Sequence, residues 1–573
     1  MNNKGFTMVE VLGVVTILVI ISLFTFPIIS SLTNDTTSKN KQFLDSLYQA
    51  TETYLEMNYE RFKNNEISYI SASKLIEEGL LSNNLINPNT NKRVIDEDGV
   101  VEATRDVDNS FKYNYAINQY ITINYIEDLI EILDSDDTYE GKTIILNRDL
   151  DFKKDESYKD INTSYKGSTL KLYLNTNGVT QKSSFFEGNI SGNGYSIDNI
   201  YMQGDMLGLF LLISNSNIEN INLSGVIDGR MGGLLADNIE ETNINNLNID
   251  IKIPYNANLD NASIGGVARA ANSVNMQNSF VVTDINIPEN SVVGGFFQQA
   301  SDTTINNCKQ EGTILGEDIG GIGVQLTDNS KIINSSSNGK LVGGNVAGLA
   351  NSAENIEIIN SFSTSNISAT HGAAGLVFDA YSLTIKNSYY NGNISAPHIG
   401  GLVFYVAYSN NIESSYAIAN IDCVNCQVVG GLVGSLSYSS TVKDSYSLAN
   451  INYGNSTGAN IGGLVGLVPA AESTSIERTS IINSYSSSTI VGTGTNTIGG
   501  LIGSSNSSTI TSSYFNSSLY NGDLIGSSTS DTITNSEGLT EKDMLIESSY
   551  NGWDFTNIWN IKNNGLPTLR KGS

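Results

Sequence analysis

A short glycine signature recurs along most of this chain and constrains its fold more than any other feature. A glycine followed by an apolar residue recurs at spacings of 25 to 37 residues, at Gly208, Gly233, Gly266, Gly295, Gly321, Gly348, Gly375, Gly401, Gly431, Gly463 and Gly500. A unit of this size without a helical stretch cannot bury its own apolar face, but stacked turns of a coil can. The repeat therefore predicts a parallel β-helix of about eleven rungs, about 4.8 Å apart.

A second signature lies between successive glycines and has the form Ile-x-Asn-Ser followed by Phe or Tyr, as in residues 358–362 and 385–389. Stacking in register would place like side chains over one another. The asparagines at 278, 307, 334, 360, 387 and 483 then predict an amide ladder at a bend, and the aromatic residues at 362, 389, 416, 446, 485 and 514 predict a stack of rings. The glycine pairs predict corners that need a positive φ or a close backbone approach.

These repeats resemble the GLUG-type repeat of bacterial surface proteins, most closely at residues 430–434 and 462–466, both Gly-Gly-Leu-Val-Gly. The resemblance covers roughly residues 140–540 and implies a β-solenoid that serves as a stalk or adhesin module. The ending, with Trp553 and Trp559, resembles the closing cap of such stacks. A cap is expected there because it blunts the last edge strand.

The N-terminus combines a seven-residue motif, Lys-Gly-Phe-Thr-Met-Val-Glu at residues 4–10, with an uncharged apolar run of membrane length over residues 11–32. This order resembles the class III leader of type IV prepilins and pseudopilins. The resemblance implies that prepilin peptidase cleaves between Gly5 and Phe6, that Phe6 becomes a methylated N-terminus, and that Glu10 pairs with the free amine of another subunit during assembly. The alternative is a simple signal anchor with a cytoplasmic N-terminus, in which Glu10 reaches the lipid headgroups.

A long helix is expected from residue 6 to about residue 62, bent at Pro27. Residues 34–120, with Asn-Pro-Asn-Thr-Asn-Lys at 87–92, resemble the small head of Gram-positive type IV pilins and pseudopilins. The fold class is thus mainly β, a parallel β-helix joined to a long N-terminal α-helix and a small α+β head. The expected segments are the leader 1–5, the transmembrane part 6–32, the outer amphipathic helix 33–62, the head 63–120, an N-terminal solenoid cap 121–145, the solenoid 146–536 and a C-terminal cap 537–573.

The net charge and the cysteine content limit which ligands and cross-links the chain can have. The formal net charge of −28 argues against nucleic-acid binding by bulk electrostatics, and three cysteines cannot form a disulfide framework. Cys423 and Cys426 leave disulfide, metal and redox interpretations open, and a disulfide requires that the segment turns. Cys308 replaces a signature serine and is expected to be buried. There is no His-Glu-x-x-His motif, and no Asp or Glu recurs at one rung position in neighbouring repeats, so we expect no metal, no cofactor and no enzymatic activity.

The sequence therefore favours a minor, tip-located type IV pilin-like subunit that displays a β-solenoid adhesin. Its expected partners are prepilin peptidase, other pilin subunits, the pilus assembly machinery, the membrane through residues 6–32, and a glycan or other cell-surface ligand. Its expected location is the bacterial cytoplasmic membrane and then the cell surface. Two alternatives stay open, a pseudopilin of a type II-like secretion system and a surface-displayed, glycan-active β-helix enzyme. Sugar binding by the tyrosine row requires that the row faces outward.

Overall fold

A computed structural model of the chain describes residues 36–63, 65–108, 110–152, 185–256, 259–288, 290–470, 478–562 and 565–570. The predicted leader, the segment 6–32 and the positions Gly5, Phe6, Glu10 and Pro27 lie outside these residues. Within them, no helix is both long enough and apolar enough to span a bilayer. The contacts divide the chain into two units. The smaller unit contains the described residues up to 152 together with 186–198 and 216–222, and the larger contains 199–215 and 223 onward.

The smaller unit packs helices against a three-stranded antiparallel sheet of order β1-β2-β3. Its elements are α2 (Thr36–Met57), α3 (Tyr59–Phe62), β1 (Ile67–Ser71), α4 (Ala72–Glu77), β2 (Gly99–Arg105), β3 (Phe111–Ile117), β4 (Tyr120–Ile123), α5 (Ile126–Asp134), β5 (Thr143–Leu146), β6 (Leu150–Asp151) and β8 (Asn189–Ser191). Leu47, Tyr54 and Leu75 are in its buried core. Because β4, β5 and β8 already pair in parallel, the stacked turns begin before residue 146.

The expected continuous helix through residue 62 is wrong at its outer end. The described part of the helix begins at Thr36 and ends at Met57, and only the four residues of α3 follow. Asn58 separates the two because its side-chain amide, like its backbone N–H, donates to the carbonyl of Tyr54, at 2.9 and 3.1 Å. Such local side-chain bonds compete with the continuation of a helix.

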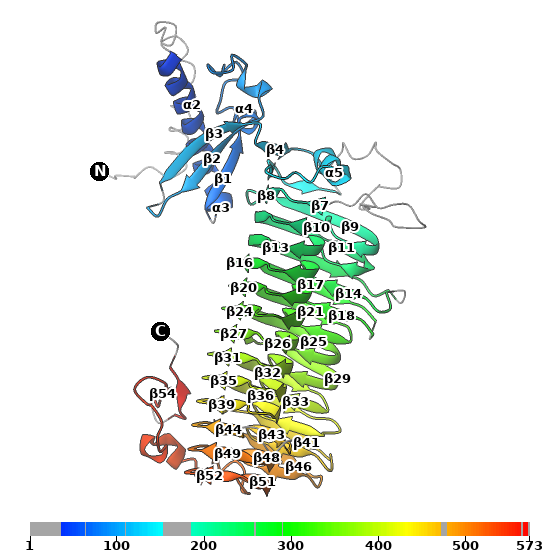
Figure 1. The fold of residues 1–573 in the computed structure, drawn as a ribbon, viewed down its shortest axis with the longest axis vertical. Helices are drawn as coiled ribbons and strands as arrows, with labels where there is room; N and C mark the ends of the chain where they lie inside the picture. Colours follow the sequence, from blue (N-terminus) through cyan, green and yellow to red (C-terminus); the bar gives the residue numbers. More distant parts are fainter. Residues whose placement is uncertain are drawn as a thin grey trace, which may run out of the picture. The chain divides into compact units, whose positions relative to one another are not determined.

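The larger unit contains most of a parallel β-solenoid of about 14 turns, not eleven. Figure 1 shows its strands stacked turn upon turn. One face is a single parallel sheet, here called the long sheet, which ends at β7 (Phe185–Phe186). Its other strands are β10 (Phe210–Ser214), β12 (Ala236–Glu240), β15 (Ala268–Asn272), β19 (Phe297–Ser301), β23 (Gly323–Thr327), β26 (Ala350–Glu354), β30 (Val377–Tyr381), β34 (Val403–Ala407), β38 (Val433–Leu436), β43 (Val465–Val468), β48 (Ile502–Asn506) and β51 (Ile525–Thr529).

The remaining strands form the other faces of each turn. Those used below are β22 (Asp318–Gly320), β25 (Ser336–Ala347), β29 (Asn366–Ala374), β32 (Tyr389–Ser395), β33 (His398–Gly400), β36 (Tyr416–Asp422), β37 (Val428–Gly430), β41 (Asn450–Gly454) and β46 (Thr489–Gly492). In the C-terminal segment, β54 (Trp559–Asn560) and β55 (Thr568–Leu569) form a separate antiparallel pair. Aliphatic residues that point inward fill the stack, and Ile385, Ile412 and Val442 are fully or almost fully buried one above another.

The glycine signature occurs fewer times than there are turns, and the reason lies in the contacts of the glycine at each corner. A Cβ built on Gly401 would lie 1.9 Å from the carbonyl oxygen of Gly431 in the next turn, and Gly375 meets Gly401 in the same way at 2.1 Å. The backbone N–H of Gly500 donates to Asp523, which starts the last turn of the long sheet. No further turn of that sheet follows Asp523 among the described residues, so no carbonyl requires a glycine there. The signature thus marks β10 to β48 and misses the end turns.

The bends confirm part of the predicted amide ladder, from Asn278 to Asn307 and from Asn334 to Asn360, and correct the role of the glycine pairs. Positive φ is supplied by the signature asparagines, for example 51° at Asn278 and 54° at Asn307. Among the glycine pairs of the described residues, a positive φ occurs at Gly232 (132°), and the other pairs provide close approach without one. The side-chain amide of Asn307 donates to Asn278 at 2.7 Å. The next signature residue is a buried serine such as Ser361, whose hydroxyl accepts the backbone N–H of the preceding turn at 3.1 Å. Cys308 occupies this position and is buried, as expected.

The predicted ring stack is confirmed from Phe362 to Tyr485. The ring centroids of successive residues 362, 389, 416, 446 and 485 lie 4.8, 4.9, 4.8 and 5.1 Å apart, with interplanar angles of at most 11°. The C-terminal segment covers the far end of this row: Trp559 is fully buried, and the Tyr485 hydroxyl donates to the carbonyl of Pro567 at 2.6 Å. Figure 1 shows this segment beside the last turns.

A buried carboxyl in the smaller unit predicts a pH-dependent stability. Burial raises the pKa of Glu219 to about 7, and the charges of Glu66 and Glu102 contribute to the increase. The pKa of Glu219 is higher in the folded than in the unfolded chain. The protonated carboxyl therefore favours the folded state at low pH, and this contribution is lost as pH rises through about 7. We expect Glu219→Gln to stabilise this unit by about 3 kcal/mol at pH 8 and not at pH 4.

Hydrogen exchange of peptides from residues 186–198 and 216–222 would measure this effect locally. The matched control is Glu140→Gln, because Glu140 is exposed in the same unit. Equal exchange rates for Glu219→Gln and the parent chain at pH 8 would contradict the prediction.

Candidate functional site

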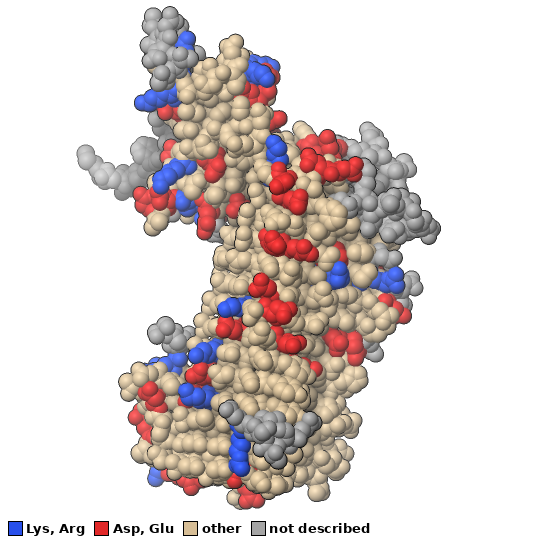
Figure 2. All heavy atoms as spheres, in the orientation of Figure 1, with Lys and Arg blue, Asp and Glu red and all other residues tan. Residues whose placement is uncertain are grey.

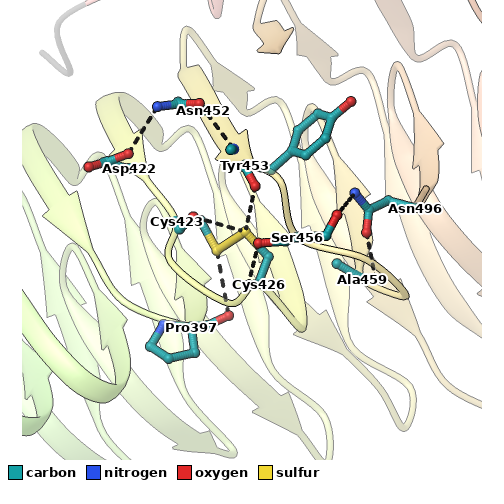
Figure 3. The surroundings of a disulfide bond; sticks show 10 residues. Pro397, Asp422, Cys423, Cys426, Asn452, Tyr453, Ser456, Ala459 and Asn496 are labelled. Carbon is teal, nitrogen blue, oxygen red and sulfur yellow. Dashed lines mark hydrogen bonds between the residues drawn. A yellow bond between two sulfur atoms is a disulfide. The ribbon is translucent and has the colours of Figure 1, made fainter. Parts of the chain in front are cut away.

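Cys423 and Cys426 are joined by a disulfide in the turn between β36 and β37 (Figure 3). The segment turns as a disulfide requires: the Cα atoms are 5.4 Å apart and Asn425 has a φ of 54°. Both cysteines are buried, and the backbone N–H of Cys426 donates to the hydroxyl of Ser456 at 2.9 Å. The bond therefore fixes a turn in the solenoid wall.

Removing this disulfide should loosen its turn without unfolding the stack. Closing so short a loop is worth about 2 kcal/mol in the chain-entropy account. We expect Cys423→Ser with Cys426→Ser, or a reductant, to speed hydrogen exchange over residues 423–427 and to leave distant turns unchanged. Cys308→Ser is the control, since Cys308 is not bonded and serine is the usual residue there. Unchanged exchange at 423–427 would show that packing alone holds the turn.

The histidines do not form a joint site. His371 lies on an exposed stretch with its Nδ1 3.3 Å from Glu317 Oε1, while the His398 ring packs on Phe404 with centroids 5.4 Å apart. In the part of the chain that the structure describes, no group of three or more His, Cys, Asp or Glu residues is placed to hold a metal ion.

The tyrosine row faces outward but offers few ring faces. Phe362, Tyr389 and Tyr416 are partly exposed. Successive rings of the row lie flat against each other with their centroids 4.8 and 4.9 Å apart, so no sugar ring fits between two of them. The cap covers Tyr446, Tyr485 and Tyr514. Sugar stacking on this row is therefore confined to its edges.

The outer face of the long sheet combines polar, aromatic and acidic side chains in one register column. Successive Cα partners on β12 to β34 are Asn238, Ala270, Gln299, Gln325, Ser352, Asp379 and Tyr405, here called the outer column. A hollow of about 350 Å³ lies over β12, β15, β19 and β23 and is lined by Asn238, Gln299 and Gln325 among others. Asp379 lies two turns beyond Gln325, about 10 Å along the stack.

Asp379 is the unusual group of this column. Its carboxyl is half-buried, and none of the described residues donates a hydrogen bond to it or forms an ion pair with it. Burial raises its pKa to about 6, and the negative charge of Asp318 raises it further. Asp318, on β22, is itself oriented by the side-chain amide of Asn345, which donates to Oδ1 at 3.0 Å.

A cluster of three tyrosines lies beside this carboxyl: Tyr405 is the register partner of Asp379, and Tyr381 packs against both Tyr405 and Tyr408. The rings of Tyr381 and Tyr405 meet edge to face at a centroid distance of 6.2 Å, and Tyr381 and Tyr408 are also 6.2 Å apart. Tyr408 is 55% exposed. The pKa of Tyr381 is raised by burial and by the charge of Asp379, which places the two groups close together. These rings are not in the flat stack of the tyrosine row, and they offer apolar surface next to a titratable acid.

This arrangement suits the chemistry of sugars. Aromatic rings stack on the apolar faces of pyranoses, and amides and hydroxyls bond their hydroxyl groups. A carboxyl with a pKa near 6 holds a proton close to neutral pH, which is what a general acid requires. A titratable group with a perturbed pKa is a marker of a functional site, and here it lies two turns beyond the hollow.

Sequence inspection missed this cluster because Asp318 and Asp379 belong to different turns and different faces. A search for one recurring carboxylate position does not detect such a pair. The usable signal was the register: Asp379 is four residues after the signature glycine Gly375, on the strand that follows the corner.

Comparisons with known proteins give little beyond the fold. No protein-family description matches the chain, and no curated protein matches it. The pilin leader and the GLUG repeat are therefore supported by no such match. Four chains of solved structures match. One is an IgA1 protease, with 15% identity and a TM-score of 0.26; the match covers 69% of this chain and 24% of that one. That protein is named as an enzyme, which is contrary to our expectation that this chain is not one; a match with this TM-score assigns no activity, residue or substrate to the chain.

Proposed function

We propose that this chain is a surface-displayed, glycan-active enzyme that holds an extended polysaccharide along the outer column of the long sheet and hydrolyses it beside Asp379. The observation that carries the proposal is the half-buried Asp379 carboxyl, with a pKa of about 6, next to the Tyr381 and Tyr405 rings. The hollow over β12 to β23 supplies the polar surface that would hold the rest of the substrate. The buried disulfide supports an oxidising, extracellular location.

An uncharged glycan is the substrate class that fits. Asp318, Glu354 and Asp379 are all acidic, and none of the ion pairs of the described residues brings Lys or Arg to them. The chain carries a net charge of −28 as well. Polyuronic acids would be repelled by this field, whereas neutral polysaccharides would not.

The proposed reaction uses both carboxyl groups. Protonated Asp379 donates its proton to the glycosidic oxygen as the bond between that oxygen and the anomeric carbon breaks. A water attacks the anomeric carbon and gives its proton to the Asp318 carboxylate. Asp318 lies two turns before Asp379, about 10 Å along the stack. Wide separations of this order leave room for a water and lead to inversion at the anomeric carbon.

Incubation of the full-length chain with neutral polysaccharides and with polyuronates, followed by assay of new reducing ends, tests the proposal. We expect hydrolysis of at least one neutral polymer, with an inverted anomer as the first product by proton NMR. Binding without hydrolysis would contradict the enzymatic part, and preference for polyuronates would contradict the assigned substrate class.

For the display of this enzyme we propose the route that the N-terminal motif favours, with cleavage between Gly5 and Phe6 and assembly through Glu10. Glu10→Ala should leave membrane insertion intact and prevent incorporation into a filament. Normal incorporation of that variant, measured in isolated filaments, would rule out this role of Glu10.

A further inference from the structure

A second polar strip lies on a different face of the solenoid from Asp379. Asn366, Asn393, Asn420 and Asn450 occupy equivalent positions on β29, β32, β36 and β41, and we call them the asparagine strip. All four side chains are exposed. They are distinct from the bend ladder, because they lie within strands of extended backbone.

The strip is held in place by its own hydrogen bonds. Each amide donates to the oxygen of the preceding turn, at 2.7 Å from Asn393 to Asn366, 3.0 Å from Asn420 to Asn393 and 2.9 Å from Asn450 to Asn420. The hydroxyl of Thr489 on β46 continues the row by donating to Asn450 at 2.9 Å. An amide has two N–H groups and two oxygen lone pairs, so each inner member keeps one donor and one acceptor for a ligand. The ladder fixes their direction before a ligand arrives, which lowers the entropic cost of binding.

The surface around the strip is hollowed and almost uncharged. A hollow of about 540 Å³ is lined by the strip and by a second polar column on the same strands. That column contains Ser368, Ser395, Asp422 and Asn452. Lys340 and Asp422 are the charged residues of the lining, and Asp422 accepts a hydrogen bond from Asn452 at 3.0 Å. Figure 2 shows that long stretches of the larger unit carry no charged side chain.

The period of the strip indicates the ligand. Donor and acceptor pairs repeat once per turn, about every 4.8 Å, which is close to the length of one sugar ring in an extended polysaccharide. Lys340 and Asp422 are the two charged residues of the lining and have opposite signs, so a charged polymer gains no net attraction here, and no aromatic ring that would anchor a peptide lines the hollow. We propose that the asparagine strip is a second, accessory binding site for an extended, uncharged polysaccharide that lies parallel to the solenoid axis. It is independent of the hydrolysis assigned to Asp379.

Binding of the full-length chain to cellulose, chitin and mannan, measured by co-sedimentation, tests this site. The variant Asn393→Thr with Asn420→Thr removes two amides and introduces residues suited to strands. We expect it to bind at least one of these polymers about tenfold more weakly than the parent chain, with Asn420→Thr alone intermediate, and to cleave short soluble oligosaccharides at the parent rate.

The matched control is Asn278→Gly with Asn307→Gly, which breaks an amide ladder at a bend, and glycine tolerates the positive φ there. It should bind as the parent does. Unchanged binding of the threonine variant, equal loss in the glycine control, or no binding of any of the three polymers by the parent chain would overturn the proposal. Asp379→Asn separates the two sites, because it should lose hydrolysis and keep binding to the strip.

Discussion

Replacing Asp379 with asparagine should lower the rate of glycan hydrolysis by at least about a hundredfold, because asparagine cannot donate the proton that leaves with the glycosidic oxygen. Binding of the polysaccharide should remain, since the amide keeps the size and hydrogen-bonding capacity of the side chain. The measurement is the release of reducing ends at saturating substrate. Asp284→Asn is the control, because Asp284 is an exposed carboxylate elsewhere on the solenoid. A rate for Asp379→Asn within a few-fold of the parent would remove Asp379 from the reaction.

The Asp379 carboxyl also sets the pH dependence of the hydrolysis rate. The general acid must be protonated, so the hydrolysis rate should fall as pH rises through about 6, the pKa to which burial and Asp318 raise the Asp379 carboxyl. Stability should follow the same sign. A raised pKa stabilises the fold at low pH, and this contribution is lost as the carboxyl ionises. Asp379→Asn should therefore be more stable than the parent at pH 8 by about 1 kcal/mol, after allowance for its partial exposure, and equally stable at pH 3.

Gly401→Ala should destabilise the solenoid strongly. The new methyl group would lie 1.9 Å from the carbonyl oxygen of Gly431, and a backbone atom of the next turn cannot move aside alone. Overpacking of this kind costs about 3 kcal/mol. Urea unfolding, with hydrogen exchange over β33, β34, β37 and β38, would measure the loss and its location.

Two variants at another glycine separate steric from conformational effects. Gly454 has a φ of 55° and open space around it. Gly454→Ala should cost about 1 kcal/mol because of its backbone conformation, and Gly454→Asn should cost less because asparagine tolerates that conformation. If Gly401→Ala is no more destabilising than Gly454→Ala, close approach between turns is not the reason for the repeated glycine.

The stacking of the chain could be predicted from its sequence because stacking forces like residues into like positions. Asn307, Ser361 and Tyr416 each repeat a neighbour of the same kind, and the structure gives those repeats an amide ladder, a serine ladder and a ring stack. The last turn could not be predicted, because no turn follows it in the long sheet among the described residues and no carbonyl there makes glycine necessary. The helix break at Asn58 could not be predicted either. The sequence pattern does not indicate that the Asn58 side chain donates a hydrogen bond to a carbonyl of the preceding helical turn.

Most of the candidate site could not be predicted from the sequence. Asp379, Asp318 and Tyr405 come from three turns, and only the register and the corner bring them together. The raised pKa of Asp379 depends on burial, which no single-residue pattern reports. Conversely, the most repetitive feature, the tyrosine row, drew attention as a sugar platform, but its regularity is the reason that its ring faces are covered.

The most direct test of the account is a crystal structure of Asp379→Asn with an oligosaccharide of a neutral polymer that the parent chain cleaves. We predict that the sugar chain lies along the outer column, from the hollow at Gln299 and Gln325 past Ser352, with one glycosidic oxygen next to residue 379. A sugar chain bound only at the asparagine strip, or crossing the long sheet away from residue 379, would contradict the proposed active site.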